Sequence, residues 1–240
     1  MQIIKFHQIS DNSNYVVPEP EPAFNSIPDW YKNQPGLITP EFHLSMGNAG
    51  ATIKKCMPIF DAMSAGYILK IPCDIYVDAT NPERLSYTET KEMKDFLPEL
   101  FQKHTPPQYN HYSVDLNVYH KELFRVNPYW AISTPKGTSV IYTHPIHRDE
   151  LPFTSLTAIV DSDKFISRGA ISMFIKKDFK GIIKQGTPFA QIIPFSRESW
   201  KMEISKFIDS EKDMDRQHMD LRSVFYNGYK NKYRSKKEFK

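Results

Sequence analysis

The feature that most constrains this chain is its proline content, since 18 of its 240 residues are proline and only 9 are glycine. Proline fixes the backbone angle φ and lacks an amide hydrogen, so it interrupts long helices and central β-strands. The chain also contains 16 phenylalanines and 13 tyrosines, and aromatic residues favour strands. These counts predict a mainly β protein whose short antiparallel strands are joined by tight turns, as in a sandwich or barrel.

Prolines are densest near the N-terminus, where residues 18–36 contain five of them. This density predicts an extended arm rather than a packed element, with Trp30 and Tyr31 anchoring it on the body. Such an arm covers a sheet edge or reaches a neighbouring subunit, and both alternatives stay open. We assign residues 1–49 to a strand at 2–9 followed by this arm.

Alternating apolar and polar residues mark a β body at residues 50–196. In residues 112–119, Val114, Leu116 and Val118 alternate with polar residues, as in a half-buried strand. The predicted strands are 66–78 (a pair), 112–119, 129–134, 138–143, 155–160, 169–176, 180–184 and 188–195. Turn residues separate them, which is typical of an antiparallel all-β body.

Two segments predict peripheral helices instead. Apolar residues recur every three or four positions in residues 88–103, where Thr88 is a candidate N-cap and Pro98 should kink the helix. Residues 197–225 are polar with scattered large apolar residues, which indicates one or two amphipathic helices. These residues begin the third predicted segment of the chain, residues 197–240, which follows the arm (1–49) and the β body (50–196).

The composition excludes several classes of protein. With 40% hydrophobic and 25% charged residues and a net charge of +3, the chain is globular rather than disordered. It has no apolar run near the roughly 18 residues of a membrane span, and no basic leader followed by an apolar stretch, so we expect a cytoplasmic protein. Cys56 and Cys73 are too few for a disulfide framework or a zinc site, and we expect no cofactor.

The region from residue 158 to residue 195 contains a series of short motifs. The motifs are Ala158-Ile159-Val160-Asp161, Arg168-Gly169 and Gly186-Thr187-Pro188-Phe189-Ala190-Gln191, with Ser64-Ala65-Gly66-Tyr67, Asn127-Pro128 and Thr134-Pro135-Lys136-Gly137 upstream. Their order resembles the core signature of the dUTPase and dCTP deaminase superfamily, closely over residues 158–195 and loosely over residues 64–195.

The resemblance implies a β-clip or jelly-roll fold, a trimer and a nucleotide site. In that site Asp161 would face the deoxyribose as the candidate catalytic residue, with Phe165 in place of a sugar-stacking tyrosine. Arg148 and Arg168 are candidate anion contacts, and Gln191 is a further candidate ligand contact. The residues alone leave another interpretation open, in which Asp161 forms an ordinary turn and Gln191 hydrogen-bonds backbone across its hairpin.

The chain departs from the family pattern where catalysis is concerned. Ile68 stands where dUTPases have an aspartate, Phe174 lies near the position of the deaminase glutamate, and no Ser-Gly-Leu-Ala turn precedes Asp161. The C-terminal region contains only Gly228, whereas the family closes its site with a glycine-rich arm. We therefore expect a protein that kept the fold and lost the catalysis, acting as a binding or structural subunit. The alternative is an enzyme acting on small phosphorylated nucleotides with Mg²⁺.

Two further hypotheses rest on residue types alone. His111, Asp115 and His144 would form the metal site of a metal-dependent enzyme if neighbouring strands brought them together; otherwise they are turn and surface residues. The basic tail at residues 230–240 contains interleaved tyrosines, which suits either phosphate contacts or a solubilising terminus. With a net charge of only +3, we do not expect a nucleic-acid partner.

A second resemblance covers the whole chain. The segments IPDWYK, TIKKCMP, DAMSAGY, NPYWAISTPKG and GTPFAQIIPF are similar to segments of proteins encoded by tailed bacteriophages and marine viruses. This implies a viral protein in the host cytoplasm or in a virion, with copies of itself and other phage proteins as partners.

Overall fold

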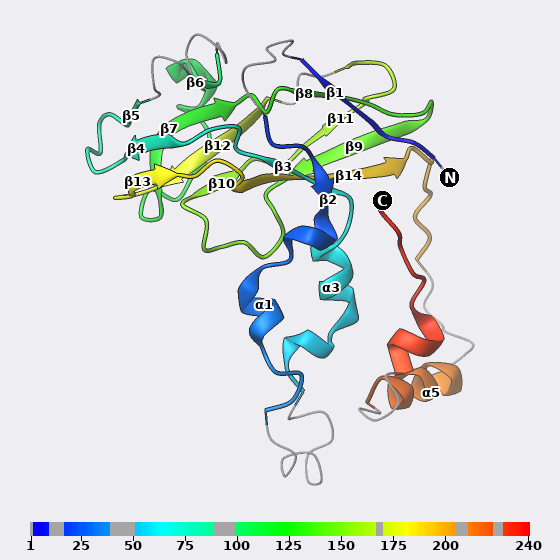
Figure 1. The fold of residues 1–240 in the computed structure, drawn as a ribbon. Coiled ribbons are helices and arrows are strands. Elements are labelled where there is room, and N and C mark those ends of the chain that lie inside the picture. Colours follow the sequence, from blue (N-terminus) through cyan, green and yellow to red (C-terminus); the bar gives the residue numbers. More distant parts are fainter. Residues whose placement is uncertain are drawn as a thin grey trace. The chain divides into compact units, whose positions relative to one another are not determined.

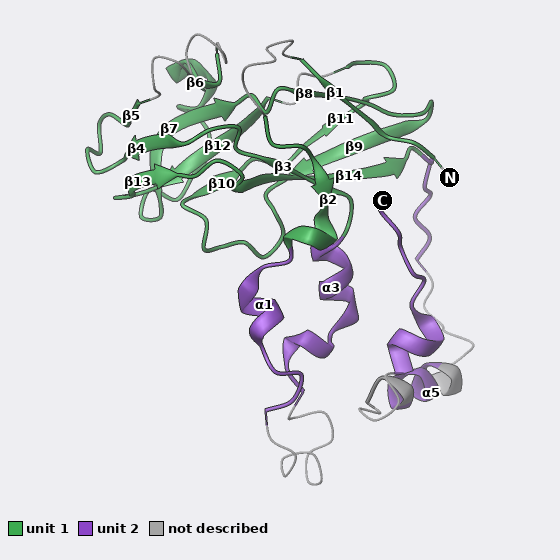
Figure 2. Cartoon of the chain, in the orientation of Figure 1, with its two compact units in different colours: residues 1–26, 65–197 green, residues 27–64, 198–240 purple. Residues whose placement is uncertain are grey.

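The computed structural model describes residues 2–9, 17–38, 51–88, 99–166, 170–204, 211–222 and 228–240. Over these residues the fold is mainly β, with several antiparallel sheets and few short helices. The chain divides into two compact units (Figure 2). Unit 1 comprises residues 1–26 and 65–197, and unit 2 comprises residues 27–64 and 198–240. Each unit thus joins segments distant in sequence, whereas the sequence suggested three consecutive segments.

All named strands belong to unit 1. They are β1 Lys5–Gln8, β2 Glu21–Pro22, β3 Tyr67–Lys70, β4 Ile75–Asp78, β5 Ser86–Thr88, β6 Phe101–Lys103, β7 Tyr119–Val126, β8 Trp130–Ser133, β9 Thr138–Thr143, β10 Phe153–Ser155, β11 Ala158–Val160, β12 Ile171–Lys176, β13 Lys180–Ile183 and β14 Pro188–Ser196. Unit 1 also contains the 3-10 helices η1 Ala23–Ser26 and η4 Pro106–Gln108.

These strands form four antiparallel sheets (Figure 1). The largest has the order β11-β9-β14-β3-β2, and a four-stranded sheet has the order β10-β12-β7-β6. The smaller sheets are β13-β4-β5 and β1-β8. Strands 138–143, 180–184 and 188–195 are confirmed almost to the residue, and two strands are present within 66–78, β3 and β4, but the expected pairing between them is wrong. The two do not pair with each other, because β3 joins the five-stranded sheet and β4 the three-stranded one.

A single apolar core lies between the sheets of unit 1. Alternation in β12 buries Met173 and Ile175, and the paired strand β7 buries Phe124 opposite Met173. From the five-stranded sheet, β14 buries Phe189 and Ile192 in the same core. Side chains of this size each contribute about 1.5–3 kcal/mol on burial. The core therefore holds the sheets together and fixes the positions of the turns.

The other face of the four-stranded sheet is partly covered as well. Phe174 points away from the core and is 2% exposed, because the rings of Tyr112 and Tyr119 lie 5.3 and 6.5 Å from its own. A strand covered on both faces reads as a nearly continuous apolar run. This explains the sequence Ile-Ser-Met-Phe-Ile of β12.

The predicted strand at residues 112–119 is wrong in most of its length. Only Tyr119 is in a strand, and residues 116–118 before it form a turn. The Asp115 carboxylate accepts a hydrogen bond from the backbone N–H of Asn117, and the Asp115 carbonyl accepts another from Val118. This local aspartate turn competes with strand pairing. It leaves Leu116 exposed, so the alternation did not reflect a buried face.

The predicted helix at residues 88–103 is wrong at both ends. Thr88 ends β5, and residues 101–103 form β6, which pairs with β7. Residues 89–98, with Pro98, lie outside the described residues. Phe101 is 3% exposed and its ring stacks on Phe124 at 4.9 Å, so tertiary packing outweighs the local helical pattern here.

The proline-rich arm is partly extended and partly helical. Glu21 and Pro22 form β2, which covers the edge of the five-stranded sheet beside β3, as one alternative predicted. The rest of the arm differs from the prediction, because η1 and then α1 (Asp29–Asn33) follow. Pro28 stands immediately before α1, where the missing amide hydrogen costs no helical hydrogen bond.

Unit 2 contains the remaining helices of the described residues. They are α1, η3 Ile53–Lys55, α3 Met57–Met63, α5 Glu211–Arg222 and a π-helix, η6 Tyr229–Tyr233. A helix within residues 197–225 is thus confirmed as α5. Among the described residues, no helix is both long and apolar enough to cross a membrane.

Candidate functional site

Gln191 connects three segments of unit 1. Its side chain points away from the apolar core of β14 and is nevertheless only 1% exposed. Nε2 donates to the Ala65 carbonyl at 2.7 Å, and Oε1 accepts from the Ile146 N–H at 3.0 Å. The amide therefore binds β14 to the turn that precedes β3 and to the turn that follows β9. We call this arrangement the Gln191 clip.

Two glycines of the same motifs are required by the backbone. Gly66 has a φ of +71°, and a β-carbon there would lie 1.9 Å from the Ile192 carbonyl oxygen. Gly186 has a φ of +81° in the turn between β13 and β14, and its N–H donates to the Ile71 carbonyl at 2.9 Å. Both positions favour glycine for conformational reasons. The motifs around them thus have a structural explanation that needs no ligand.

Asp161, the candidate catalytic residue, belongs to a network of charged groups at the end of β9. Its carboxylate accepts a hydrogen bond from the Ser139 hydroxyl at 2.6 Å and lies 3.1 Å from the Arg197 guanidinium. Arg197 also donates to Asp163 at 2.7 Å, and the Gly137 N–H donates to Asp163 at 2.8 Å. The hydrogen bond from Ser139 and the nearby Arg197 lower the pKa of Asp161.

The network is expected to make stability depend on pH. The Arg197 guanidinium and the Gly137 N–H hold the pKa of Asp163 far below its usual range. A carboxyl in the unfolded chain has a pKa of about 4. When folding lowers this pKa, the ionised carboxyl stabilises the fold above about pH 4, and the stabilisation is lost as the pH falls through the pKa of the folded state. Arg197→Gln should therefore lower the melting temperature at pH 7, and the difference from the unsubstituted protein should narrow below about pH 4.

Scanning calorimetry between neutral and acidic pH tests this expectation. The control is Lys184→Gln, because Lys184 pairs with Asp74 while both side chains are at least half exposed. Exposed pairs contribute little, so the control should melt close to the unsubstituted protein. If Arg197→Gln and Lys184→Gln lower the melting temperature equally at pH 7, the structural role of Arg197 is contradicted.

Arg148 is also bonded within the chain. Its Nε donates to the Glu150 carboxylate, and its Nη1 donates to the Ser26 carbonyl at 3.2 Å. It therefore holds η1 beside the turn that follows β9. Arg168 lies outside the described residues.

The candidate metal ligands His111, Asp115 and His144 do not form a cluster. Among the residues that the structure describes, no group of three or more His, Cys, Asp or Glu side chains is placed to bind a metal. His144 bonds to backbone through both ring nitrogens, to the Arg148 carbonyl at 3.2 Å and to the Ser155 N–H at 3.2 Å. Burial lowers its pKa, which favours the neutral ring that this pattern needs.

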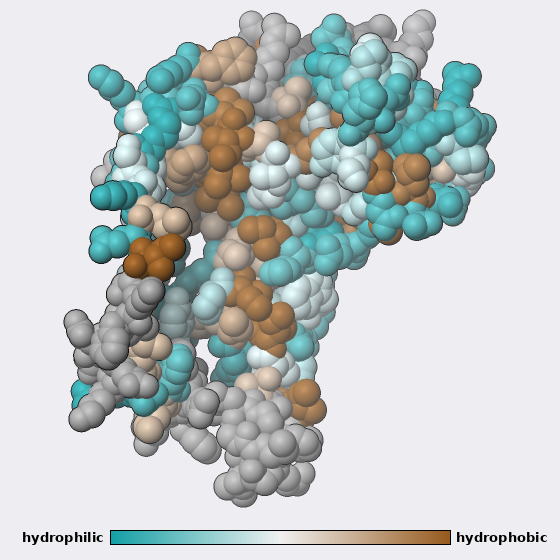
Figure 3. Space-filling model, turned by 180° about the vertical axis from the view of Figure 1, so that it is seen from behind, coloured by the Kyte–Doolittle hydropathy of each residue, from teal (hydrophilic) through white to brown (hydrophobic). Residues whose placement is uncertain are grey.

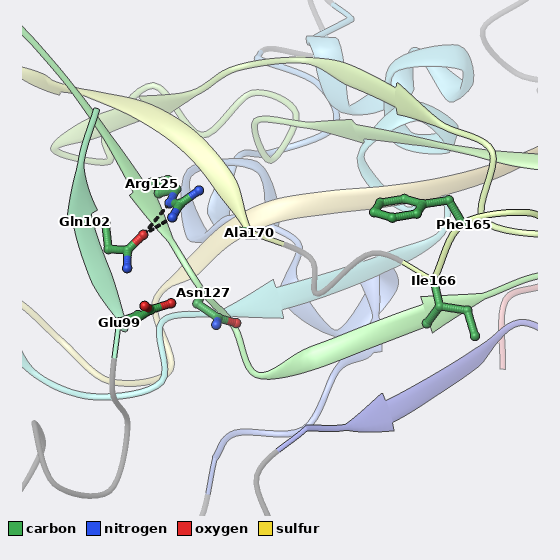
Figure 4. A pocket seen from close by; sticks show the side chains of 7 residues that line it. All are labelled: Glu99, Gln102, Arg125, Asn127, Phe165, Ile166 and Ala170. Atoms are coloured by element: carbon green, nitrogen blue, oxygen red, sulfur yellow. Dashed lines mark hydrogen bonds between the residues drawn. The ribbon is translucent and has the colours of Figure 1, made fainter. Parts of the chain in front are cut away.

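A cavity of about 450 Å³ lies between the β6–β7 pair and the turn that contains Phe165 (Figure 4). Its lining residues are Glu99, Gln102, Arg125, Asn127, Phe165, Ile166 and Ala170. The polar side chains lie on one side of Ala170, and Phe165 and Ile166 lie on the other (Figure 4). Phe165 is 65% exposed, and the Nε of Arg125 donates to the Gln102 oxygen at 2.6 Å.

Of the predicted site residues that the structure describes, this cavity contains only Phe165. The sequence analysis missed Arg125 and Gln102, which face each other across β7 and β6. The signal in β7 is weak: Arg125 is the single exposed residue in a strand that is otherwise buried or half-buried. The pairing of β7 with β6 was not foreseeable, because residues 101–103 were assigned to a helix.

Unit 2 contains a separate ionic cluster that binds the basic tail. Asp61, which is 9% exposed, accepts hydrogen bonds from Arg234 at 2.6 and 3.0 Å and from Lys237 at 3.3 Å. The Arg234 guanidinium lies 5.8 Å from the centre of the Phe60 ring. Hydrogen bonds from Arg234 lower the pKa of Asp61. Part of the tail's positive charge is thus paired within the chain.

Asp61→Asn should release the tail from α3, because the neutral amide keeps the shape but loses the attraction to both cations. We expect trypsin to cleave after the basic residues of 230–240 faster than in the unsubstituted protein. The control is Asp29→Asn, because Asp29 pairs with Lys32 at 3.7 Å but is 86% exposed in its side chain. If Asp61→Asn and the control are cleaved at the same rate, the docking of the tail does not depend on Asp61.

Comparisons of the chain with protein-family models and with curated proteins found no match.

Proposed function

We propose that this chain is a non-catalytic protein of β-clip or jelly-roll type that acts as a binding or assembly subunit. The mainly β fold supports the β-clip assignment. The hydrogen bond from Gln191 to the Ala65 carbonyl supports it too, because it joins the Ser-Ala-Gly-Tyr segment to the strand after Gly186. By resemblance, the subunit forms a homo-oligomer of three copies and belongs to a virus, either in its particle or in the infected cell.

The observation that carries this proposal is that the candidate catalytic residue and two candidate ligand contacts bond to groups of the chain itself. Asp161 is bonded to Ser139 and Arg197, Arg148 to Glu150 and a backbone carbonyl, and Gln191 to two backbone groups. A catalytic group must instead present its reactive atom to a substrate in a suitable protonation state. Such bonding is what a fold requires of a buried polar side chain such as that of Gln191, which is 1% exposed.

The test is a panel of deoxynucleoside mono-, di- and triphosphates incubated with the protein and Mg²⁺. We expect product to form no faster than in a protein-free control. Turnover that disappears in Asp161→Asn would contradict the proposal and would support an enzyme of nucleotide metabolism.

A second candidate function is favoured by the cavity at Phe165. Its volume suits a small ligand, and it combines an exposed aromatic ring with a guanidinium, as a nucleotide-binding site would. Under this alternative, nucleotides should bind the unsubstituted protein, and Phe165→Ala and Arg125→Gln should both weaken the binding in calorimetric titrations. The alternative fails if the three proteins bind equally or not at all.

A further inference from the structure

Polar side chains from three strands meet on the outer face of the four-stranded sheet. Arg125 of β7 pairs with Gln102 of β6 on one side and with Ser172 of β12 on the other. Paired residues share a face of a sheet, with β-carbons about 4.5–5.5 Å apart. This face points away from the core, because Met173, the next residue of β12, is buried in the core. His104 follows β6, and its ring nitrogen Nε2 lies 2.9 Å from the Ser172 hydroxyl oxygen.

Hydrogen bonds determine which nitrogen of a neutral His104 ring carries the proton. The side-chain oxygen of Gln108 accepts from the backbone N–H of Thr105 at 3.0 Å, so this oxygen faces the ring as an acceptor. It lies 3.1 Å from Nδ1 of His104, and Nδ1 must therefore donate to it. In the neutral ring Nε2 is then an acceptor, and it takes the hydroxyl proton of Ser172. The Ser172 hydroxyl thus offers a ligand only its lone pairs.

Arg125 is an exposed cation that retains unused hydrogen-bond donors. Hydrophilic side chains cover much of the face shown in Figure 3, so exposure alone does not mark a site. Arg125 is distinguished by its partners: Nε and Nη2 donate to the Gln102 oxygen, and Nη1 has no hydrogen bond within the part of the chain described. No ion pair of the described residues includes Arg125 or His104. Such a guanidinium suits an oxyanion, which accepts from several N–H groups at once.

Space for a ligand lies beside Arg125. This residue lines the cavity of about 450 Å³ at Phe165, and Ser172 lines a second cavity of about 230 Å³. Ala170 lines both, so the two cavities lie next to each other at the start of β12. A group held by Arg125 and Ser172 therefore has room to continue into a larger molecule.

The charged groups around His104 are mostly positive. The titratable side chains near it are Arg125, Lys121 and Tyr119 on the same face of β7, Lys176 of β12, Tyr112 against Phe174, and Glu99 in the cavity beside Arg125. The 3-10 helix η4 has none. Lys121 is paired with Glu83 at 2.5 Å, whereas Arg125 has no such partner among the described residues. A proton on His104 therefore adds a second positive charge beside Arg125, which is unfavourable until an anion lies between them.

We propose that Arg125 and Ser172 bind a tetrahedral oxyanion, the phosphate or sulfate group of a ligand, and that binding adds one proton to the His104 ring. A protonated ring donates through both nitrogens, to Gln108 and to Ser172. The Ser172 hydroxyl then turns its own proton toward the anion beside Arg125. The anion in turn offsets the repulsion between the two cations. The inference rests on the binding role proposed above and names the chemical group that is bound.

The test is isothermal titration calorimetry of the full chain with sulfate at constant ionic strength. Sulfate does not titrate between about pH 8 and about pH 6, the range in which histidines gain a proton, so any pH dependence comes from the protein. Titrations in buffers of different ionisation enthalpy give the number of protons taken up. We expect uptake of up to about one proton, and an affinity that rises as the pH falls, because the bound state holds more protons.

Three variants separate the contributions. Arg125→Gln should weaken sulfate binding at least about tenfold, because a charged hydrogen-bond donor is lost. Ser172→Ala should weaken it severalfold. His104→Gln should abolish the proton uptake and leave an affinity that no longer depends on pH. The controls are Lys136→Gln and His218→Gln, which remove an exposed positive charge and an exposed histidine elsewhere, and neither should change the binding.

A second titration, with a deoxynucleoside monophosphate, distinguishes the sources of the anion. Binding that is tighter than that of sulfate and is weakened by Arg125→Gln indicates a phosphate group carried by a larger ligand. An affinity no higher than that of sulfate indicates a free anion. Both results agree with an oxyanion site at Arg125.

Absence of saturable sulfate binding, or binding that is unchanged in Arg125→Gln, would overturn the inference. Proton uptake that persists in His104→Gln would overturn it as well. In each case the proposed function would stand, because it fails only if deoxynucleotides are turned over, whatever the result with sulfate.

Discussion

Replacing Gly66 with alanine is expected to destabilise unit 1 by about 3 kcal/mol or more. The φ of +71° is a left-handed conformation that costs alanine about 1 kcal/mol. The larger effect is steric, because the new β-carbon would lie 1.9 Å from the Ile192 carbonyl oxygen. Neither backbone segment can move away without disturbing the pairing of β14 with β3. Denaturant unfolding followed by circular dichroism measures the loss.

The matched control is Gly137→Ala. Gly137 has a φ of +84°, but a β-carbon there would meet nothing within 4 Å. This variant should therefore lose only the conformational term, about 1 kcal/mol. Equal losses at the two positions would mean that the close approach of the 65–66 turn to β14 is not tight in solution.

Replacing Gln191 with methionine is expected to cost about 2–4 kcal/mol. Methionine has nearly the same volume, so the change removes the amide without leaving a large cavity. The part-buried Ala65 carbonyl and Ile146 N–H then lose the partner that the buried Gln191 amide gave them, and each unsatisfied group costs about 1–3 kcal/mol. The expected result is a lower midpoint of denaturant unfolding with an unchanged slope.

Gln185→Met is the control for this change. Gln185 also donates to a backbone carbonyl, that of Pro72 at 3.0 Å, but it lies on the surface. Water can replace that hydrogen bond, so the loss should stay below about 1 kcal/mol. A Gln191→Met variant as stable as the control would show that the clip contributes nothing to folding.

The strands could be predicted where the local pattern and the tertiary environment agree. Residues 138–143 and 180–184 are bounded by turn residues and carry β-branched or aromatic side chains, and both are strands as expected. The pattern failed at residues 112–119, where the Asp115 turn interrupts the chain. It failed again at residues 101–103, where stacking of Phe101 on Phe124 favours a strand.

The candidate site was less predictable than the fold. The sequence indicated that Gln191 can bind backbone, and the structure identifies Ala65 and Ile146 as the partners. The sequence did not indicate that Arg197 lies beside Asp161, because the two residues are 36 positions apart and share no motif. Contacts between distant segments depend on sheet order, which one sequence does not encode in its local pattern.

The structural roles of Gly66, Gly186 and Gln191 bear on the proposed function. They account for three positions of the family-like motifs through backbone conformation and hydrogen bonding. These roles concern the fold and do not depend on catalysis. Their presence is therefore compatible with a binding or assembly subunit, as proposed.

The central claim is that Gln191 holds the fold closed through the backbone around β14. Amide hydrogen exchange at Ile146, measured in the unsubstituted protein and in Gln191→Met, tests it most directly. We predict strong protection of the Ile146 N–H in the first protein, and exchange faster by orders of magnitude in the second. Free exchange of that amide in the unsubstituted protein, or equal protection in both proteins, would contradict the account.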